Sequence, residues 1–196
     1  MSAQNSESLT LRITQYLFNP GSWVSEQALL RATGPAPIAL NDGIIDLVAK
    51  SLQPKLLPPF FEKPSHRLVL LSQSEWHDLA LGCLLLCYSG AITRQMDGQF
   101  RAMCKQVANA DVIAQIDALA LPDKPLFTGD WSCTQSTIEG AISAILRTLE
   151  LPKDVYDYTV LRFANALPSA NIDRLTLSQI EVACKISLPN LLPLLS

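Results

Sequence analysis

The residues of this chain that could bind a metal are few, and the candidates considered lie in or just before one apolar stretch. Cys83 and Cys87 are four residues apart, so a helix would place both thiols on one face, and His77 precedes Cys83 by six residues. Zinc could use such a set, but apolar residues at this spacing are also what a packed core helix contains. Because free cysteine is among the most buried residue types, we predict core cysteines, no metal and no cofactor.

A second group with possible chemistry is the carboxylate pair Asp154 and Asp157, which lies beside Tyr156 and Tyr158. Two carboxylates in a cleft could perform acid–base catalysis, but a solvated helix face is the favoured interpretation. The chain contains no HExxH, no GxSxG, no glycine-rich phosphate loop and no EF-hand spacing. We therefore predict no catalytic residues and a protein that is not an enzyme.

The aromatic residues next to turns are candidates for contact with a partner. Trp23 follows Phe18-Asn-Pro-Gly-Ser, and Trp131 follows Phe127-Thr-Gly-Asp. Each tryptophan either closes the edge of the core, which is the favoured interpretation, or is a binding hot spot for a partner. The predicted partner-binding residues are Phe18, Trp23, Arg94, Arg101, Asp130 and Trp131.

Composition limits the class of protein further. The chain has 196 residues, of which 48% are hydrophobic and 17% charged, with a net charge of −3. Such a chain can bury a sizeable core, and without a basic cluster we expect no nucleic-acid ligand. Its five cysteines form no CxxC pair, which indicates free thiols in a reducing compartment. The apolar stretch Leu79–Tyr88 is too short to span a membrane, and residues 1–10 lack the features of a secretory signal.

Hydrophobic periodicity predicts an all-α fold: one compact domain of about eight or nine helices around a central buried helix at approximately residues 72–89. Residues 6–17 also fit a short strand, but a helix is favoured. A small N-terminal subdomain at residues 1–52 is a further possibility. It would be joined by an irregular proline-rich loop at 53–66 to a main helical body at 67–196.

Capping signals predict the other helices. Gly90 is expected to end the central helix, within a small-residue joint, Ser89–Ala91. The remaining expected helices are a short one capped by Ser25 and ending at Arg31, Gly43–Leu52 capped by Asp42, Ala91–Ala108, Val112–Leu121, one from Thr134 or Ser136 to Leu149, Lys153–Leu167, and Leu177–Ser187 opened by a capping box at Thr176 and Gln179.

Three landmarks, in the same order along nearly the whole chain, resemble the SctK family of type III secretion accessory proteins. The first is Phe18-Asn-Pro-Gly-Ser-Trp-Val, similar to the family's "F-D/N-P-x-S-Y/W-h" opening. The second is Leu79–Gln99, similar to its apolar helix, small-residue joint and amphipathic helix. The third is Leu126–Ser132, similar to a "hhhGPWP" element, although Asp130 stands where some members have proline.

The resemblance implies a cytoplasmic scaffold at the cytosolic face of the bacterial inner membrane, within the injectisome. It implies an adaptor that links an SctD-like inner-membrane ring protein to an SctQ-like pod protein, and indirectly to the SctL/SctN ATPase complex. Such an adaptor would not insert into the membrane and would be monomeric alone. The alternatives are a secretion chaperone or regulator, usually a dimer that binds a segment of an exported protein, and a small metal protein that uses His77.

Overall fold

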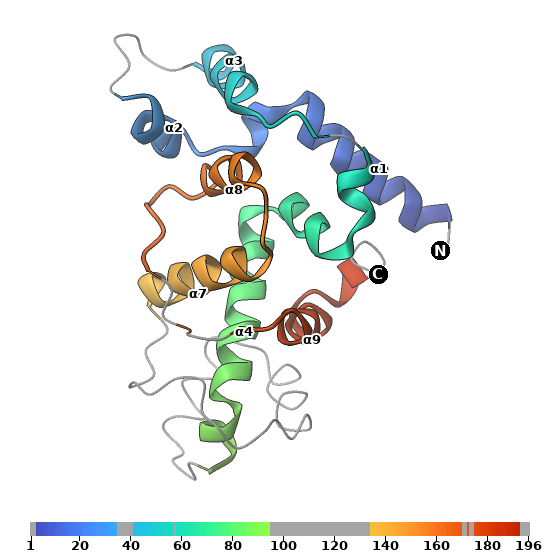
Figure 1. Cartoon of the computed structure of the whole chain (residues 1–196), viewed down its shortest axis with the longest axis vertical. Helices are drawn as coiled ribbons and strands as arrows, with labels where there is room; N and C mark the ends of the chain where they lie inside the picture. Colours follow the sequence, from blue (N-terminus) through green and yellow to red (C-terminus); the bar gives the residue numbers. More distant parts are fainter. Residues whose placement is uncertain are drawn as a thin grey trace. The chain divides into compact units, whose positions relative to one another are not determined.

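The computed structural model describes residues 3–34, 41–56, 58–94, 134–169, 172 and 175–192, and for residues 3–8 and 88–94 it describes the backbone alone. The regular elements within these ranges are all helices, so the predicted all-α fold is confirmed. Figure 1 labels the α-helices, and the contacts of the chain divide the described residues into two units. Unit 1 comprises the described residues of Met1–Gln73 and Leu149–Leu167, and unit 2 those of Ser74–Thr148 and Pro168–Leu192. The predicted subdomain at 1–52 stays a prediction.

Unit 1 is built from four α-helices and three 3₁₀-helices. Its first helix confirms the helical interpretation of residues 6–17, and Leu9, Ile13, Tyr16 and Leu17 pack together on the inner face of α1. The elements are α1 (Ala3–Phe18), η1 (Pro20–Trp23), α2 (Glu26–Thr33), α3 (Asp42–Leu52), η2 (Pro58–Glu62), η3 (Pro64–Leu70) and α8 (Lys153–Val160). Helix α2 ends at Gly34, whose φ of 83° is a conformation that glycine adopts without steric cost.

The prediction that residues 53–66 form an irregular proline-rich loop is wrong over most of that length, because η2 and the start of η3 occupy it. Prolines at the starts of η2 and η3 fix φ where a helix needs it and lack only an N–H that would be unpaired there. Side chains then hold the two short helices together. The Arg67 Nε–H donates to the carbonyl of Phe61 over 2.7 Å, and the His66 ring stacks on Phe60 with centroids 4.4 Å apart.

Two expected helix ends in unit 1 also need correction. The cap of α3 is Asn41, not Asp42, because the Asn41 side-chain oxygen accepts a hydrogen bond from Ile44 N over 3.0 Å. Helix α8 ends at Val160, not at Leu167. From Leu161 to Phe163, each backbone N–H bonds to the carbonyl three residues earlier, so the last turn tightens and the helix stops.

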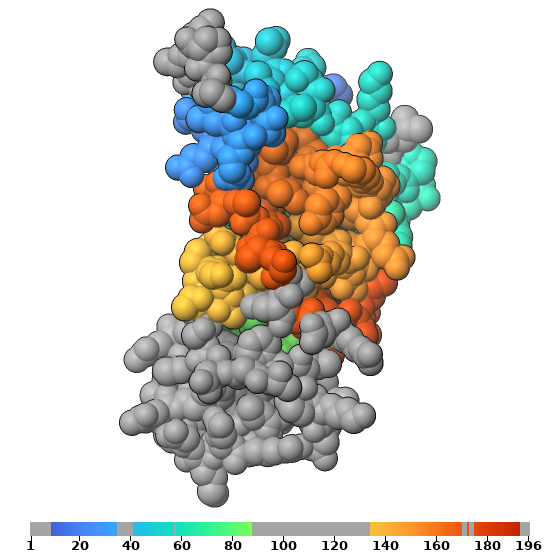
Figure 2. Space-filling model, turned by 60° about the vertical axis from the view of Figure 1, so that its left-hand side comes forward, coloured from blue at the N-terminus to red at the C-terminus, as the bar shows by residue number. Residues whose placement is uncertain are grey.

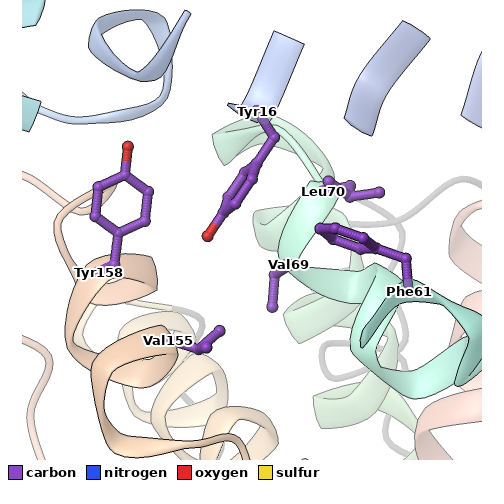
Figure 3. Close-up of a cluster of buried hydrophobic side chains, with 6 residues drawn as sticks. All are labelled: Tyr16, Phe61, Val69, Leu70, Val155 and Tyr158. Carbon is purple, nitrogen blue, oxygen red and sulfur yellow. The ribbon is translucent and has the colours of Figure 1, made fainter. Parts of the chain in front are cut away.

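The core of unit 1 is a cluster of buried side chains that come from four elements (Figure 3). Tyr16 of α1 lies at its centre and is fully buried. Its ring makes edge-on contacts with Phe61 and Tyr158, with centroids 6.2 and 5.7 Å apart. Aromatic pairs in this geometry add about 0.5–1.5 kcal/mol each beyond the area that they bury. The cluster therefore fixes α1 against η2 and α8.

Unit 2 contains α4 (Gln73–Arg94) from Ser74 onward, with α7 (Gln135–Thr148) and α9 (Leu177–Ser187). The predicted central helix is confirmed as buried, since every side chain from Leu79 to Cys87 lies in the core. Its predicted end is wrong, because the helix continues through Gly90 to Arg94. The small-residue joint is therefore part of the helix. The rest of the expected helix 91–108, and the one at 112–121, lie outside the described residues.

Helices α4 and α9 cross at Gly82. A Cβ atom added there would lie 2.1 Å from Ser187 Oγ and 3.4 Å from the Ala183 carbonyl oxygen. The absence of a side chain thus lets the two helix backbones approach closely. The capping box that opens α9 at Thr176 and Gln179 is present as predicted. None of the described helices is both long and apolar enough to span a bilayer.

Candidate partner-binding surface

The segment Phe18–Val24, here called the Phe18 turn, leads from α1 to α2 and is fixed by hydrogen bonds to other elements. The Gly21 backbone N–H donates to Asp46 Oδ1 of α3 over 3.0 Å. The Tyr158 hydroxyl of α8 donates to the carbonyl of Pro20, which is itself buried, over 3.4 Å. A Cβ on Gly21 would lie 3.0 Å from the Asp46 Cα, so glycine also allows close packing on α3. The turn therefore has a defined conformation.

Trp23 is the point where the turn contacts the aromatic core. Its ring lies edge-on to that of Tyr16, with centroids 5.9 Å apart. The guanidinium carbon of Arg162 lies 4.3 Å from the centre of the Trp23 ring and 5.7 Å from that of Tyr16. A cation over an aromatic face is worth about 0.5–2 kcal/mol, with the larger values for desolvated pairs. Since only 4% of Arg162 is exposed, the pair is desolvated, and its energy should lie toward the upper end of that range.

Arg162 also connects the turn to the segment after α8. Its Nη1 donates to the carbonyl of Leu71, at the end of η3. The same segment bonds twice to the region of α2: Ser25 N–H donates to the Leu161 carbonyl over 2.7 Å, and Arg31 Nη2 donates to the Phe163 carbonyl over 2.9 Å. Figure 2 shows α2, in blue, beside the orange residues that follow α8.

The two tyrosines of the cluster differ in their hydrogen bonding, and their hydroxyl groups point in opposite directions (Figure 3). The Tyr158 hydroxyl reaches the Phe18 turn, as described above. The Tyr16 hydroxyl is buried and has no hydrogen-bond partner among the residues that the structure describes. Burial raises the pKa of Tyr158 to about 12 and raises that of Tyr16 above its ordinary value, in both cases against the opposing charge of Arg162. Both phenols are therefore neutral near pH 7.

Phe18 itself points away from this packed region. As the last residue of α1 it is 79% exposed, the largest value among the exposed large apolar side chains of the described residues. An apolar ring in water next to a fixed turn costs little ordering entropy when a partner covers it. The Phe18 turn thus combines a rigid, anchored inner side at Trp23 with an exposed aromatic side chain.

The residues considered first for metal binding are buried. Cys83 and Cys87 of α4 lie in the core of unit 2, as predicted, and so does Cys184 of α9. Burial raises the pKa of Cys87 and of Cys184 to about 12, and burial together with the neighbouring thiols raises that of Cys83. Such thiols are poor nucleophiles. In the described part of the chain, no three histidine, cysteine or acidic side chains are grouped so that they could hold a metal ion.

The carboxylate pair of α8 lies on an exposed helix face. Asp154 and Asp157 are both exposed, and Asp157 accepts a hydrogen bond from Lys153 Nζ one turn earlier. Surface pairs of this kind contribute little to stability. The favoured interpretation of these residues, a solvated helix face, is therefore confirmed.

The structure brings two of the six predicted partner-binding residues together, since Phe18 and Trp23 both belong to the Phe18 turn. For Trp23 it favours the role of closing the core edge. Arg94 is the last residue of α4, and its side chain lies outside the described ones, as do Arg101, Asp130 and Trp131 entirely. The sequence reasoning missed Arg162. Its flanking apolar residues, Leu161 and Phe163, were the only signal that it could be buried.

No family model, curated protein or solved structure matches this chain.

Proposed function

We propose that the chain is a non-enzymatic adaptor of the type III secretion sorting platform. It would link an SctD-like inner-membrane ring protein to an SctQ-like pod protein, and through the pod to the SctL/SctN ATPase complex, at the cytosolic face of the bacterial inner membrane. Two lines of support carry the proposal: the resemblance of three sequence landmarks to the SctK family, and the form that the first landmark takes in the structure.

The observation that supports it best is that the Phe18 turn has one packed aromatic residue and one exposed aromatic residue. Trp23 packs under Arg162 and against Tyr16, while Phe18 is 79% exposed at the end of α1. An adaptor needs surfaces that keep their shape when a partner arrives, because a preorganised surface loses less entropy on binding. Aromatic residues, phenylalanine included, are also enriched at protein–protein interfaces.

The proposal predicts that the purified chain forms a stable complex with the SctQ-like protein encoded in the same genome. It predicts weaker binding to the cytosolic domain of the SctD-like protein. Co-purification of the chain with each candidate, followed by titration calorimetry, measures both. If neither protein binds the folded chain, the adaptor role is wrong.

The contribution of the Phe18 turn is tested with a pair of matched variants. Phe18→Ala should weaken binding to the SctQ-like protein by about tenfold or more, since burying a phenylalanine side chain is worth about 1.5–3 kcal/mol. Leu47→Ala is the control, because Leu47 is 72% exposed on α3 of the same unit but lies outside the turn. Equal effects of the two changes would mean that the turn is not the binding surface.

A further inference from the structure

We draw no further inference here: the strongest candidate, the exposed face of α1 between Leu11 and Phe18, carries none because nothing in the part of the chain that the structure describes shows what would cover it.

Discussion

Replacing Tyr16 by phenylalanine should stabilise the protein, although Tyr16 is the most central residue of the unit 1 core. The change keeps the ring, with its edge-on contacts to Trp23, Phe61 and Tyr158. It removes only a buried hydroxyl that has no hydrogen-bond partner among the described residues. A buried polar group left without a partner costs about 1–3 kcal/mol. We therefore expect Tyr16→Phe to raise the free energy of unfolding by about 1 kcal/mol.

Tyr158→Phe is the matched control, and its effect should have the opposite sign. It removes the hydrogen bond to the Pro20 carbonyl, which at 3.4 Å is long and therefore at the weak end of the usual range of about 0.5–1.5 kcal/mol. The expected loss is about 0.5 kcal/mol. The two tyrosine rings lie 5.7 Å apart in the same cluster, so a general softening of the core would affect both variants alike.

Urea denaturation followed by tryptophan fluorescence measures both changes, because Trp23 packs against the cluster. In a thermal melt, 1 kcal/mol corresponds to a shift in Tm of about 2–4 °C for a chain of this size. The expected order is Tyr16→Phe above wild type and Tyr158→Phe below it. If Tyr16→Phe is less stable than wild type by 1 kcal/mol or more, its hydroxyl has a partner, and the cluster described here is wrong at its centre.

Three further predictions concern pH, a helix crossing and a helix cap. Stability should fall as pH rises from about 10 to 12, because the unfolded chain releases the protons of Tyr16 and Tyr158 near pH 10 while the folded chain retains them; alkaline urea titrations should show a shallower fall in the double phenylalanine variant. Gly82→Ala should destabilise by about 1 kcal/mol more in the wild type than in a Ser187→Ala background, since the added Cβ meets Ser187 Oγ, and additive effects in a double-mutant cycle would contradict the close α4–α9 crossing. Asn41→Ala should cost about 1 kcal/mol in thermal unfolding because α3 loses its cap, whereas Asn41→Asp should retain most of the stability; no loss in the alanine variant would show that the cap contributes nothing.

Local signals in the sequence predicted those helices whose ends depend on neighbouring residues. The capping box at Thr176 and Gln179 gave the correct start of α9, and the seams of apolar residues gave α1 and α7. These features act within one or two turns of chain, so a single sequence contains all the information needed. The buried central helix was predictable for a similar reason, because a helix that is apolar on all sides must be buried, whichever elements pack around it.

Long-range contacts explain most of what the sequence did not predict. The early end of α8 accompanies the placement of the Arg162 guanidinium over the Trp23 ring and its hydrogen bond to the Leu71 carbonyl, and both residues are far from Arg162 in the chain. The two 3₁₀-helices of the proline-rich segment are held by Arg67 and His66, whose carbonyl partners could not be inferred from composition. In α4, Gly90 resembled a helix end, yet the helix continues, because glycine lowers helix propensity by only about 1 kcal/mol.

The sequence predicted which residues form the candidate surface, but not which of them is exposed. The motif identified Phe18 and Trp23 together but left open whether each contacts a partner or the core. That distinction depends on which side of the turn meets Tyr16 and Arg162, which only the three-dimensional arrangement specifies. The division into an anchored Trp23 and an exposed Phe18 is therefore a structural finding.

The central claim is that the exposed Phe18, presented by an anchored turn, is a partner-binding residue of a secretion adaptor. The most direct test is a calorimetric titration of the SctQ-like protein from the same genome with wild-type chain, Phe18→Ala and Leu47→Ala. The account predicts a complex with wild type and with Leu47→Ala, and affinity lower by about tenfold or more with Phe18→Ala at unchanged Tm. Wild-type affinity in the Phe18→Ala variant, or no complex with any of the three, would contradict it.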